Sequence, residues 1–257
     1  MVHFTHLFLP VGAFLLFQHC ATEAPLPPYQ PPVAVVIDDR SGTIAQHGIS
    51  RPDTAFYATA AREFQTHCPG AELAVILCGN PRPEARSSIR FEADTNRPQH
   101  PGDDANHKER LAARLHNEAL YRHWQQQRSA FTALLDSLVI RYQPQAGNDV
   151  TFLDTALLRA RQILDAQVYA QRPKLLIVLS DGYNESASGQ RIPFARTFVT
   201  DADAGQLDII LNAWENPDTS IFKGPIRLRR TESLPDALKE LRAFIQEHRA
   251  PRGSPAQ

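Results

Sequence analysis

Carboxylate and hydroxyl side chains stand at three places in this sequence where they could together bind a hard cation. The candidate ligands are two aspartates and three hydroxyl residues: Asp39, Ser41, Thr43, Thr151 and Asp181. Oxygen ligands of this kind suit Mg²⁺, Mn²⁺ or Ca²⁺ and require neither thiol nor imidazole. Because the hydroxyls are neutral, a cation held by this set keeps part of its charge and can accept an anionic ligand from a partner.

Each group of candidate ligands follows a predicted strand or opens a predicted helix. Residues 33–37 (VAVVI) and 175–179 (LLIVL) are unbroken aliphatic runs, which are typical of strands buried on both faces of a parallel sheet. Thr151 stands where a helix over 153–166 is predicted to begin. Since ligands of open α/β sheets bind beyond the carboxyl ends of the strands, we expect these groups to meet at one sheet edge.

The rest of the chain alternates predicted strands with predicted helices. Further strands are predicted over 73–77, 88–92, 207–211 and 226–230, and further helices over 52–67, 107–138 and 234–248. This alternation predicts an α/β fold: an open, mostly parallel, doubly wound sheet with helices on both faces and one short antiparallel edge strand. The basic run Arg227 to Arg230 is interpreted as the exposed side of an edge strand.

The helix over 107–138 is unusually long, and we expect a break near Ser129. Its predicted inward face is marked by apolar residues at helical spacing: Leu111, Leu115, Ala119, Phe131, Leu134 and Leu138.

With the candidate ligands in this order, the sequence resembles a von Willebrand factor A (vWA) domain with a metal-ion-dependent adhesion site. The resemblance covers about 33–248. Asp39, Ser41 and Thr43 match the family's D-x-S-x-S segment, Thr151 its loop threonine and Asp181 its later aspartate. It implies a Rossmann-like sheet and a Mg²⁺ (or Ca²⁺ or Mn²⁺) that contacts the hydroxyls directly and the aspartates largely through water. It also implies a protein partner that donates a carboxylate, and hence a binding module rather than an enzyme.

Two residues depart from the family pattern. Asp38 stands where the family usually has an aliphatic residue, so it is an additional candidate ligand or the true strand-end aspartate. Arg40 lies inside the motif, where it either helps to attract an anionic ligand or faces solvent.

Three other interpretations of the candidate ligands stay open. Each aspartate or threonine can simply cap the helix that follows it. The fold can be a scaffold whose degenerate site holds no metal. The segment from Asp39 also resembles the first motif of haloacid dehalogenase-like phosphatases, with Asp39 as nucleophile, but Ser41 stands where that chemistry needs a second aspartate.

The N-terminal region indicates export. Residues 7–17 (LFLPVGAFLLF) carry no charge, are too short to span a bilayer as a helix and have the length of a signal-peptide core. Cys20 and a Pro-rich stretch follow, as in a bacterial lipoprotein leader, so Cys20 is a candidate for lipidation. We predict a leader (1–20), a Pro-rich linker (21–32), a vWA-like domain (33–248) and a disordered tail (249–257) in a protein of the bacterial cell envelope, either anchored or secreted.

The remaining composition limits the other classes of function. A hydrophobic fraction of 42% permits a sizeable core, and a formal net charge of −1 gives no indication of nucleic-acid binding. Cys68 and Cys78 are candidates for a disulfide in an oxidising compartment, or else two buried thiols.

Overall fold

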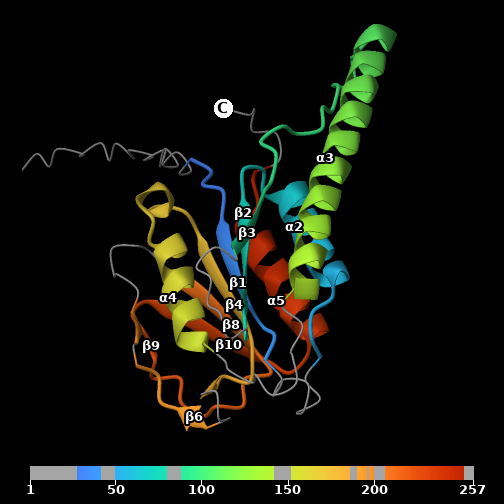
Figure 1. The fold of residues 1–257 in the computed structure, drawn as a ribbon. Helices are drawn as coiled ribbons and strands as arrows, with labels where there is room; N and C mark the ends of the chain where they lie inside the picture. Colours follow the sequence, from blue (N-terminus) through green and yellow to red (C-terminus); the bar gives the residue numbers. More distant parts are fainter. Residues whose placement is uncertain are drawn as a thin grey trace, which may run out of the picture.

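A six-stranded sheet forms the centre of the molecule, in the strand order β10-β8-β4-β1-β2-β3 (Figure 1). The computed structural model describes residues 28–41, 50–79, 88–141, 152–185, 190–195, 197–199 and 206–251. The strands are β1 (Val33–Asp39), β2 (Glu72–Cys78), β3 (Ser88–Glu92), β4 (Lys174–Leu179), β8 (Leu207–Asn212) and β10 (Ile226–Thr231). All neighbouring strands pair in parallel except β2 and β3. The prediction of a mostly parallel sheet with one short antiparallel edge strand is therefore confirmed.

Helices cover both faces of this sheet. Helices α2 (Thr54–His67), α3 (His107–Arg141) and α5 (Leu234–Glu247) pack on one face, and α4 (Leu153–Leu164) packs on the other (Figure 1). Side chains alternate between the faces along a strand. In β1, Ala34 and Val36 pack against the three-helix side, whereas Val35 and Ile37 pack against the α4 side. The arrangement is consistent with a vWA or Rossmann-like fold.

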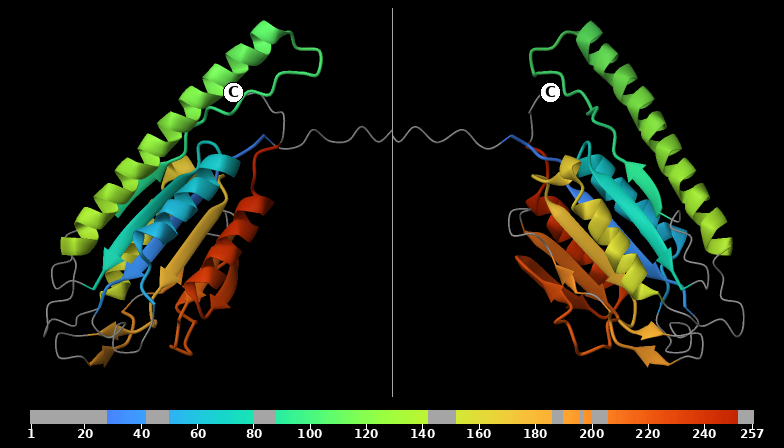
Figure 2. Two further views of the ribbon diagram at one scale, coloured as in Figure 1. Left: turned by 90° about the vertical axis from the view of Figure 1, so that its right-hand side faces the viewer. Right: turned by 60° about the vertical axis from the view of Figure 1, so that its left-hand side comes forward.

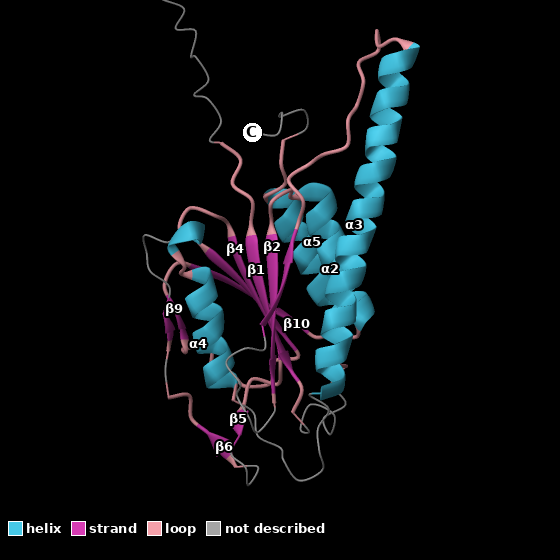
Figure 3. Ribbon diagram, turned by 45° about the horizontal axis from the view of Figure 1, so that its top comes forward, coloured by secondary structure: helices cyan, strands magenta, loops and turns pink. Residues whose placement is uncertain are grey.

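Smaller elements complete the α4 side. They are a 3₁₀ turn (Gln167–Tyr169) and four two-residue strands, β5 (Asn184–Glu185), β6 (Arg191–Ile192), β7 (Phe198–Val199) and β9 (Phe222–Lys223). The antiparallel pair of β5 and β6, called the β5–β6 hairpin below, lies beyond the carboxyl ends of the central strands (Figure 3).

Helix α3 differs from its prediction in two respects. It continues without a break past Ser129 to Arg141. Its buried residues are Ala113, Leu120, Trp124, Phe131 and Leu135, whereas Leu111, Leu115 and Leu134 are 47%, 57% and 52% exposed. The first half of the helix extends beyond the sheet (Figure 2). There it contacts the loop that precedes it: Asn117 Oδ1 accepts from Gln99 N at 2.7 Å and its Nδ2 donates to the Gln99 carbonyl at 2.9 Å.

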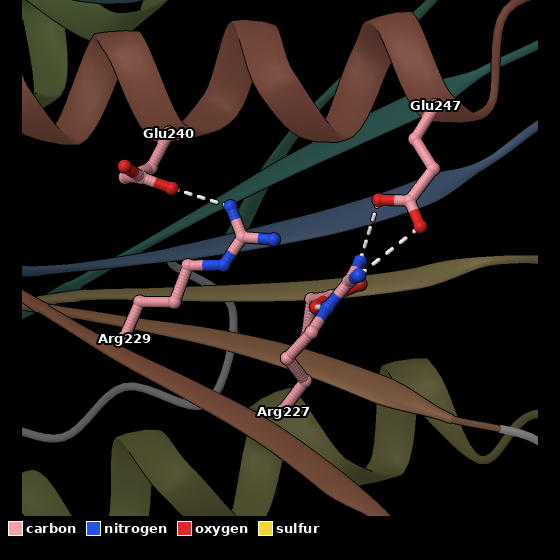
Figure 4. Close-up of polar contacts among 5 residues, drawn as sticks. Arg227, Arg229, Glu240 and Glu247 are labelled. Carbon is pink, nitrogen blue, oxygen red and sulfur yellow. Dashed lines mark hydrogen bonds and ion pairs between the residues drawn. The ribbon is translucent and has the colours of Figure 1, made fainter.

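Ion pairs join the edge strand β10 to α5 (Figure 4). Arg227 Nη2 lies 2.7 Å from Glu247 Oε2 and 2.8 Å from Asp208 Oδ2, and Arg229 pairs with Glu240. The prediction of an edge strand is therefore confirmed, but Arg227 and Arg229 are only partly exposed, because alternate residues of the strand face α5 and its acidic side chains. Only Arg230 of the three is exposed.

The two ends of the described chain lie at the sheet edge where the parallel strands begin (Figures 1 and 3). Arg172 holds the N-terminal segment there: its Nε donates to the Pro31 carbonyl at 2.6 Å and its Nη2 to the Pro32 carbonyl at 3.1 Å. At the other end, Ala250 N donates to the His67 carbonyl at 3.1 Å. The last five residues of the predicted linker, 28–32, thus lie against the domain. The predicted leader, including Cys20, and residues 252–257 lie outside the described residues.

No helix in the described ranges is both long enough and apolar enough to cross a bilayer.

Candidate metal centre

Asp39 ends β1 on the α4 side of the sheet and is almost fully buried. Its Oδ1 accepts from Ser41 N at 2.9 Å, and its Oδ2 accepts from Ser180 Oγ at 2.8 Å. Ser180 directly follows β4, which pairs with β1. The carboxyl ends of two adjacent strands are therefore connected through the Asp39 carboxylate, and Ser41, which is fully buried, lies at the same place.

Asp181 follows Ser180 and is also buried. Its Oδ1 accepts from Tyr183 N at 3.0 Å, and its carbonyl accepts from Glu215 N at 2.9 Å. These bonds fix Asp181 between the β5–β6 hairpin and the loop after β8.

Two glycines allow the chain to pack closely around these aspartates. Gly182 has φ 83°, and a Cβ there would lie 2.5 Å from the Trp214 indole. Gly79 has φ 101°, and a Cβ there would lie 2.4 Å from Ser41 N. A side chain at either position would displace the loops that carry Asp181 or Ser41.

The two carboxylates act on each other electrostatically. Burial raises the pKa of Asp39 to about 7, and the negative charge of Asp181 contributes to the rise. The hydrogen bonds from Ser41 and Ser180 oppose this rise, because they stabilise the charged form. The structure thus brings together Asp39, Ser41 and Asp181 of the five predicted ligands. Thr43 and Thr151 lie outside the described residues.

Asp38, the additional candidate ligand, faces the other side of the sheet. Its Oδ2 accepts from Tyr57 Oη on α2 at 2.6 Å and from Arg40 Nε and Nη2 at 2.8 and 2.5 Å. Burial raises the pKa of Asp38, and the positive charge of Arg40 opposes that rise. Arg40 is only 7% exposed and also donates to the Pro52 carbonyl at 2.8 Å. Both interpretations of Arg40, as a solvated side chain or as an attractor of ligands, are therefore wrong.

Among the described residues, the groups that could hold a cation are Asp39 and Asp181 with the hydroxyls of Ser41 and Ser180. No cluster of three or more His, Cys, Asp or Glu side chains suited to a metal occurs in this part of the chain. Two carboxylates supplemented by hydroxyls form a hard-oxygen donor set, which fits Mg²⁺ or Ca²⁺ better than a thiophilic metal.

The sequence reasoning missed the residues that fix the β5–β6 hairpin beside this site. Asp154, in the first turn of α4, accepts through Oδ2 from Asn184 Nδ2 and from Ala195 N, each at 2.9 Å. Its backbone N donates to Asn184 Oδ1 at 3.3 Å. The one sequence signal that could have identified Asp154 is the preference for an acidic residue near a helix N-terminus. The sequence gives no signal for its hydrogen bonds with Asn184 and Ala195, which lie 30 and 41 positions further along the chain.

A cavity of about 480 Å³ lies on the other side of Asp181, beyond the ends of β8 and β10. Among the described residues of its lining, the charged ones are Glu215, Glu232 and Arg230, that is, two glutamates and one arginine.

Cys68 and Cys78 are both buried free thiols, so the alternative of a disulfide between them is corrected. Cys68 lies next to the start of β2, because its carbonyl accepts from Ala71 N at 2.9 Å, whereas Cys78 ends that strand. Seven residues of strand at about 3.3 Å each separate them by roughly 20 Å, well beyond disulfide reach.

Comparison with known proteins gives similarities to solved structures, but none to a protein family or a curated protein. No model of a known protein family matches the sequence, and no curated protein matches it significantly. A solved structure similar to this chain is the pilus adhesin SpaC from Lactobacillus rhamnosus GG in its open conformation, with a TM-score of 0.44 and 12% identity over 86% of this chain and 30% of the adhesin. Another structure of the same adhesin gives 0.43 and 13% over 86% and 31%.

The human COPII-coat protein Sec24c gives a TM-score of 0.40 and 11% identity over 85% of this chain and 32% of its own. This chain thus spans about a third of each of these proteins. Similarities this distant carry no argument about function, which rests on the site itself.

Proposed function

We propose that this chain is a divalent-cation-dependent protein-binding module of the vWA type. The cation, Mg²⁺ or else Ca²⁺ or Mn²⁺, would be held by Asp39, Ser41, Thr43, Thr151 and Asp181. The observation that carries the proposal is the pair of buried carboxylates, Asp39 and Asp181, at the carboxyl ends of β1 and β4, connected through Ser180.

Charge is the physical reason for a cation at this place. Two carboxylates that are buried close together repel each other, and a divalent cation between them would offset that repulsion. Ser41 and Ser180 orient Asp39 by hydrogen bonds from a backbone N–H and a hydroxyl. When bound, the cation supplies an electrophilic position that a partner's carboxylate can occupy. Binding rather than catalysis is proposed, because Ser41 cannot take the role of a general acid.

The described chain enters the domain away from the proposed site. The segment 28–32 lies at the sheet edge where the parallel strands begin, whereas Asp39 and Asp181 lie where β1 and β4 end (Figure 3). The segment 28–32 therefore leaves the proposed site open to a partner.

A metal-free scaffold is the second candidate. The hydrogen bonds that Asp39 accepts from Ser41 and Ser180 favour it, since they partly satisfy this carboxylate without any cation.

Thermal unfolding with and without cation separates the two candidates. A ligand at about 100 times its Kd stabilises the folded state by about 2.7 kcal/mol, so Mg²⁺ should raise the Tm of the wild type by several degrees. The Asp39→Asn variant should show no such rise. Equal Tm values for the wild type with Mg²⁺ and with EDTA would favour the scaffold. Turnover of p-nitrophenyl phosphate that Asp39→Asn abolishes would favour the phosphatase instead.

A further inference from the structure

The β5–β6 hairpin lies next to the proposed cation site. It begins three residues after Asp181, and Tyr183 N donates to Asp181 Oδ1 at 3.0 Å. Asn184 and Ala195 bind Asp154 in the first turn of α4, the helix that follows Thr151 in the sequence. The hairpin is therefore fixed to Asp181, a proposed ligand. It is also fixed to α4, which begins two residues after Thr151, another proposed ligand.

Arg191 is the exposed charged residue among the described residues of this hairpin. It is exposed, and its guanidinium carbon lies 3.5 Å from the centroid of the Tyr183 ring. Arg191 pairs across the hairpin with Glu185, two residues after Tyr183, so Tyr183 and Arg191 share one face. Within the described ranges Arg191 makes no ion pair, and the stacking on Tyr183 restricts the side chain while leaving its N–H donors available.

The surroundings of Asp181 are asymmetric in charge. On the side of β8 and β10, the cavity carries Glu215 and Glu232 against Arg230. On the hairpin side, Arg191 is exposed, whereas Glu185, the residue opposite it in the β5–β6 hairpin, is only 4% exposed, so the positive charge is the one that faces solvent. A second negative group on a partner would be repelled on the first side and attracted on the second.

We propose that the partner presents two neighbouring acidic side chains, one for the cation and one for Arg191. This inference rests on the proposed function and names its partner as an acidic protein segment. The Cα atoms of Tyr183 and Asp181 are at most about 7 Å apart, and Arg191 lies over the Tyr183 ring, so an extended stretch of the partner can reach both contacts. The planar guanidinium pairs with a carboxylate through two parallel N–H donors, which suits it to this second position.

The test uses fluorescein-labelled poly-L-glutamate as a model acidic segment, with the full chain and Mg²⁺, followed by fluorescence anisotropy. Arg191→Ala should weaken the binding of poly-L-glutamate about ten-fold, as expected for the loss of a charge-assisted contact, and leave the affinity for Mg²⁺ alone unchanged. Tyr183→Leu, which removes the ring under Arg191, should weaken it about two- to five-fold, because binding must then immobilise the freed Arg191 side chain. The matched control is Arg114→Ala, an exposed arginine on the far part of α3 that changes the net charge equally.

The outcomes separate this inference from the proposed function. In one outcome, the wild type binds Mg²⁺ while Arg191→Ala and Arg114→Ala weaken the binding of poly-L-glutamate equally. That result would overturn the inference and leave the proposed function standing. A Mg²⁺-binding wild type that does not bind poly-L-glutamate would overturn it as well. Binding that depends on Arg191 but not on Mg²⁺ would overturn both, because the first acidic side chain would then have no cation to bind.

Discussion

Asp38 and Asp39 are consecutive residues of β1, yet their carboxyl groups lie on opposite faces of the sheet. Asp38 contacts Tyr57 of α2 and Arg40, whereas Asp39 contacts Ser180 at the end of β4. Both are buried. The two adjacent acids therefore have separate roles: Asp38 holds the fold on the three-helix side, and Asp39 belongs to the proposed cation site.

The same mutation at these two positions should give opposite results. Asp38→Asn leaves the Arg40 guanidinium buried without its charged partner, so we expect a loss of about 3–5 kcal/mol in the free energy of unfolding, with Mg²⁺ binding retained in the folded fraction. Asp39→Asn should abolish Mg²⁺ binding. Urea unfolding and Mg²⁺ titration of both variants measure this. Loss of Mg²⁺ binding in a folded Asp38→Asn protein would contradict the assignment.

Arg172 should contribute more to stability than an exposed arginine. It donates to the carbonyls of Pro31, Pro32 and Gly70 and pairs with Glu72 at 2.8 Å, with side chains only 11% and 20% exposed. We expect Arg172→Ala to lower the free energy of unfolding by about 2–3 kcal/mol.

The control for Arg172 is Arg114→Ala, whose pair with Glu118 is 76% and 50% exposed and should contribute less than about 1 kcal/mol. Urea unfolding compares the two variants. Equal effects would contradict the role of Arg172 as the clamp of the N-terminal segment.

Both described thiols should be unreactive in the native protein. Burial raises the pKa of Cys68 to about 12 and holds that of Cys78 well above its usual value, so little thiolate forms at neutral pH. Iodoacetamide followed by peptide mass spectrometry should show Cys68 and Cys78 unmodified in the native state. Both should be fully alkylated in urea without reductant. A Cys68–Cys78 cross-linked peptide would contradict the separation of these residues along β2.

His248 should make stability depend on pH. Burial lowers its pKa; the charges of Glu247 and Asp208 oppose this, and that of Arg227 adds to it. A histidine whose pKa is lowered on folding contributes stability above its usual pKa of about 6.5, and this contribution is lost as the pH falls through the lowered value.

The advantage of the wild type over His248→Gln in urea midpoint should therefore be larger at about pH 7.5 than at about pH 5. A difference that does not change with pH would reject this assignment. Comparison with the variant removes the contribution of the other histidines.

The central strands β1, β2 and β4 were predictable because their sequences contain unbroken aliphatic runs bounded by turn residues or polar residues. The five parallel strands and the helices α2, α4 and α5 lie close to their predicted ranges. The placement of Asp39 and Asp181 at one sheet edge followed from the same topology, since each lies two residues after such a run.

The errors arose where a contact with a distant segment decides the outcome. Spacing alone placed Leu111 and Leu115 on the inner face of α3, but that part of the helix extends past the sheet and has little to pack against. Arg227 and Arg229 were expected in solvent because the acids on α5 that pair with them are remote in sequence. Arg40 was misinterpreted because its partner Asp38 faces away from the site.

The most direct test of the central claim is a calorimetric titration of the folded chain with Mg²⁺, beside Asp181→Ala and Thr151→Ala. The account predicts saturable binding of one Mg²⁺ per chain that both substitutions remove, while thermal unfolding shows each variant to be folded. A folded wild type that gives no saturable heat, or one whose binding persists in both variants, would contradict a cation site at the ends of β1 and β4.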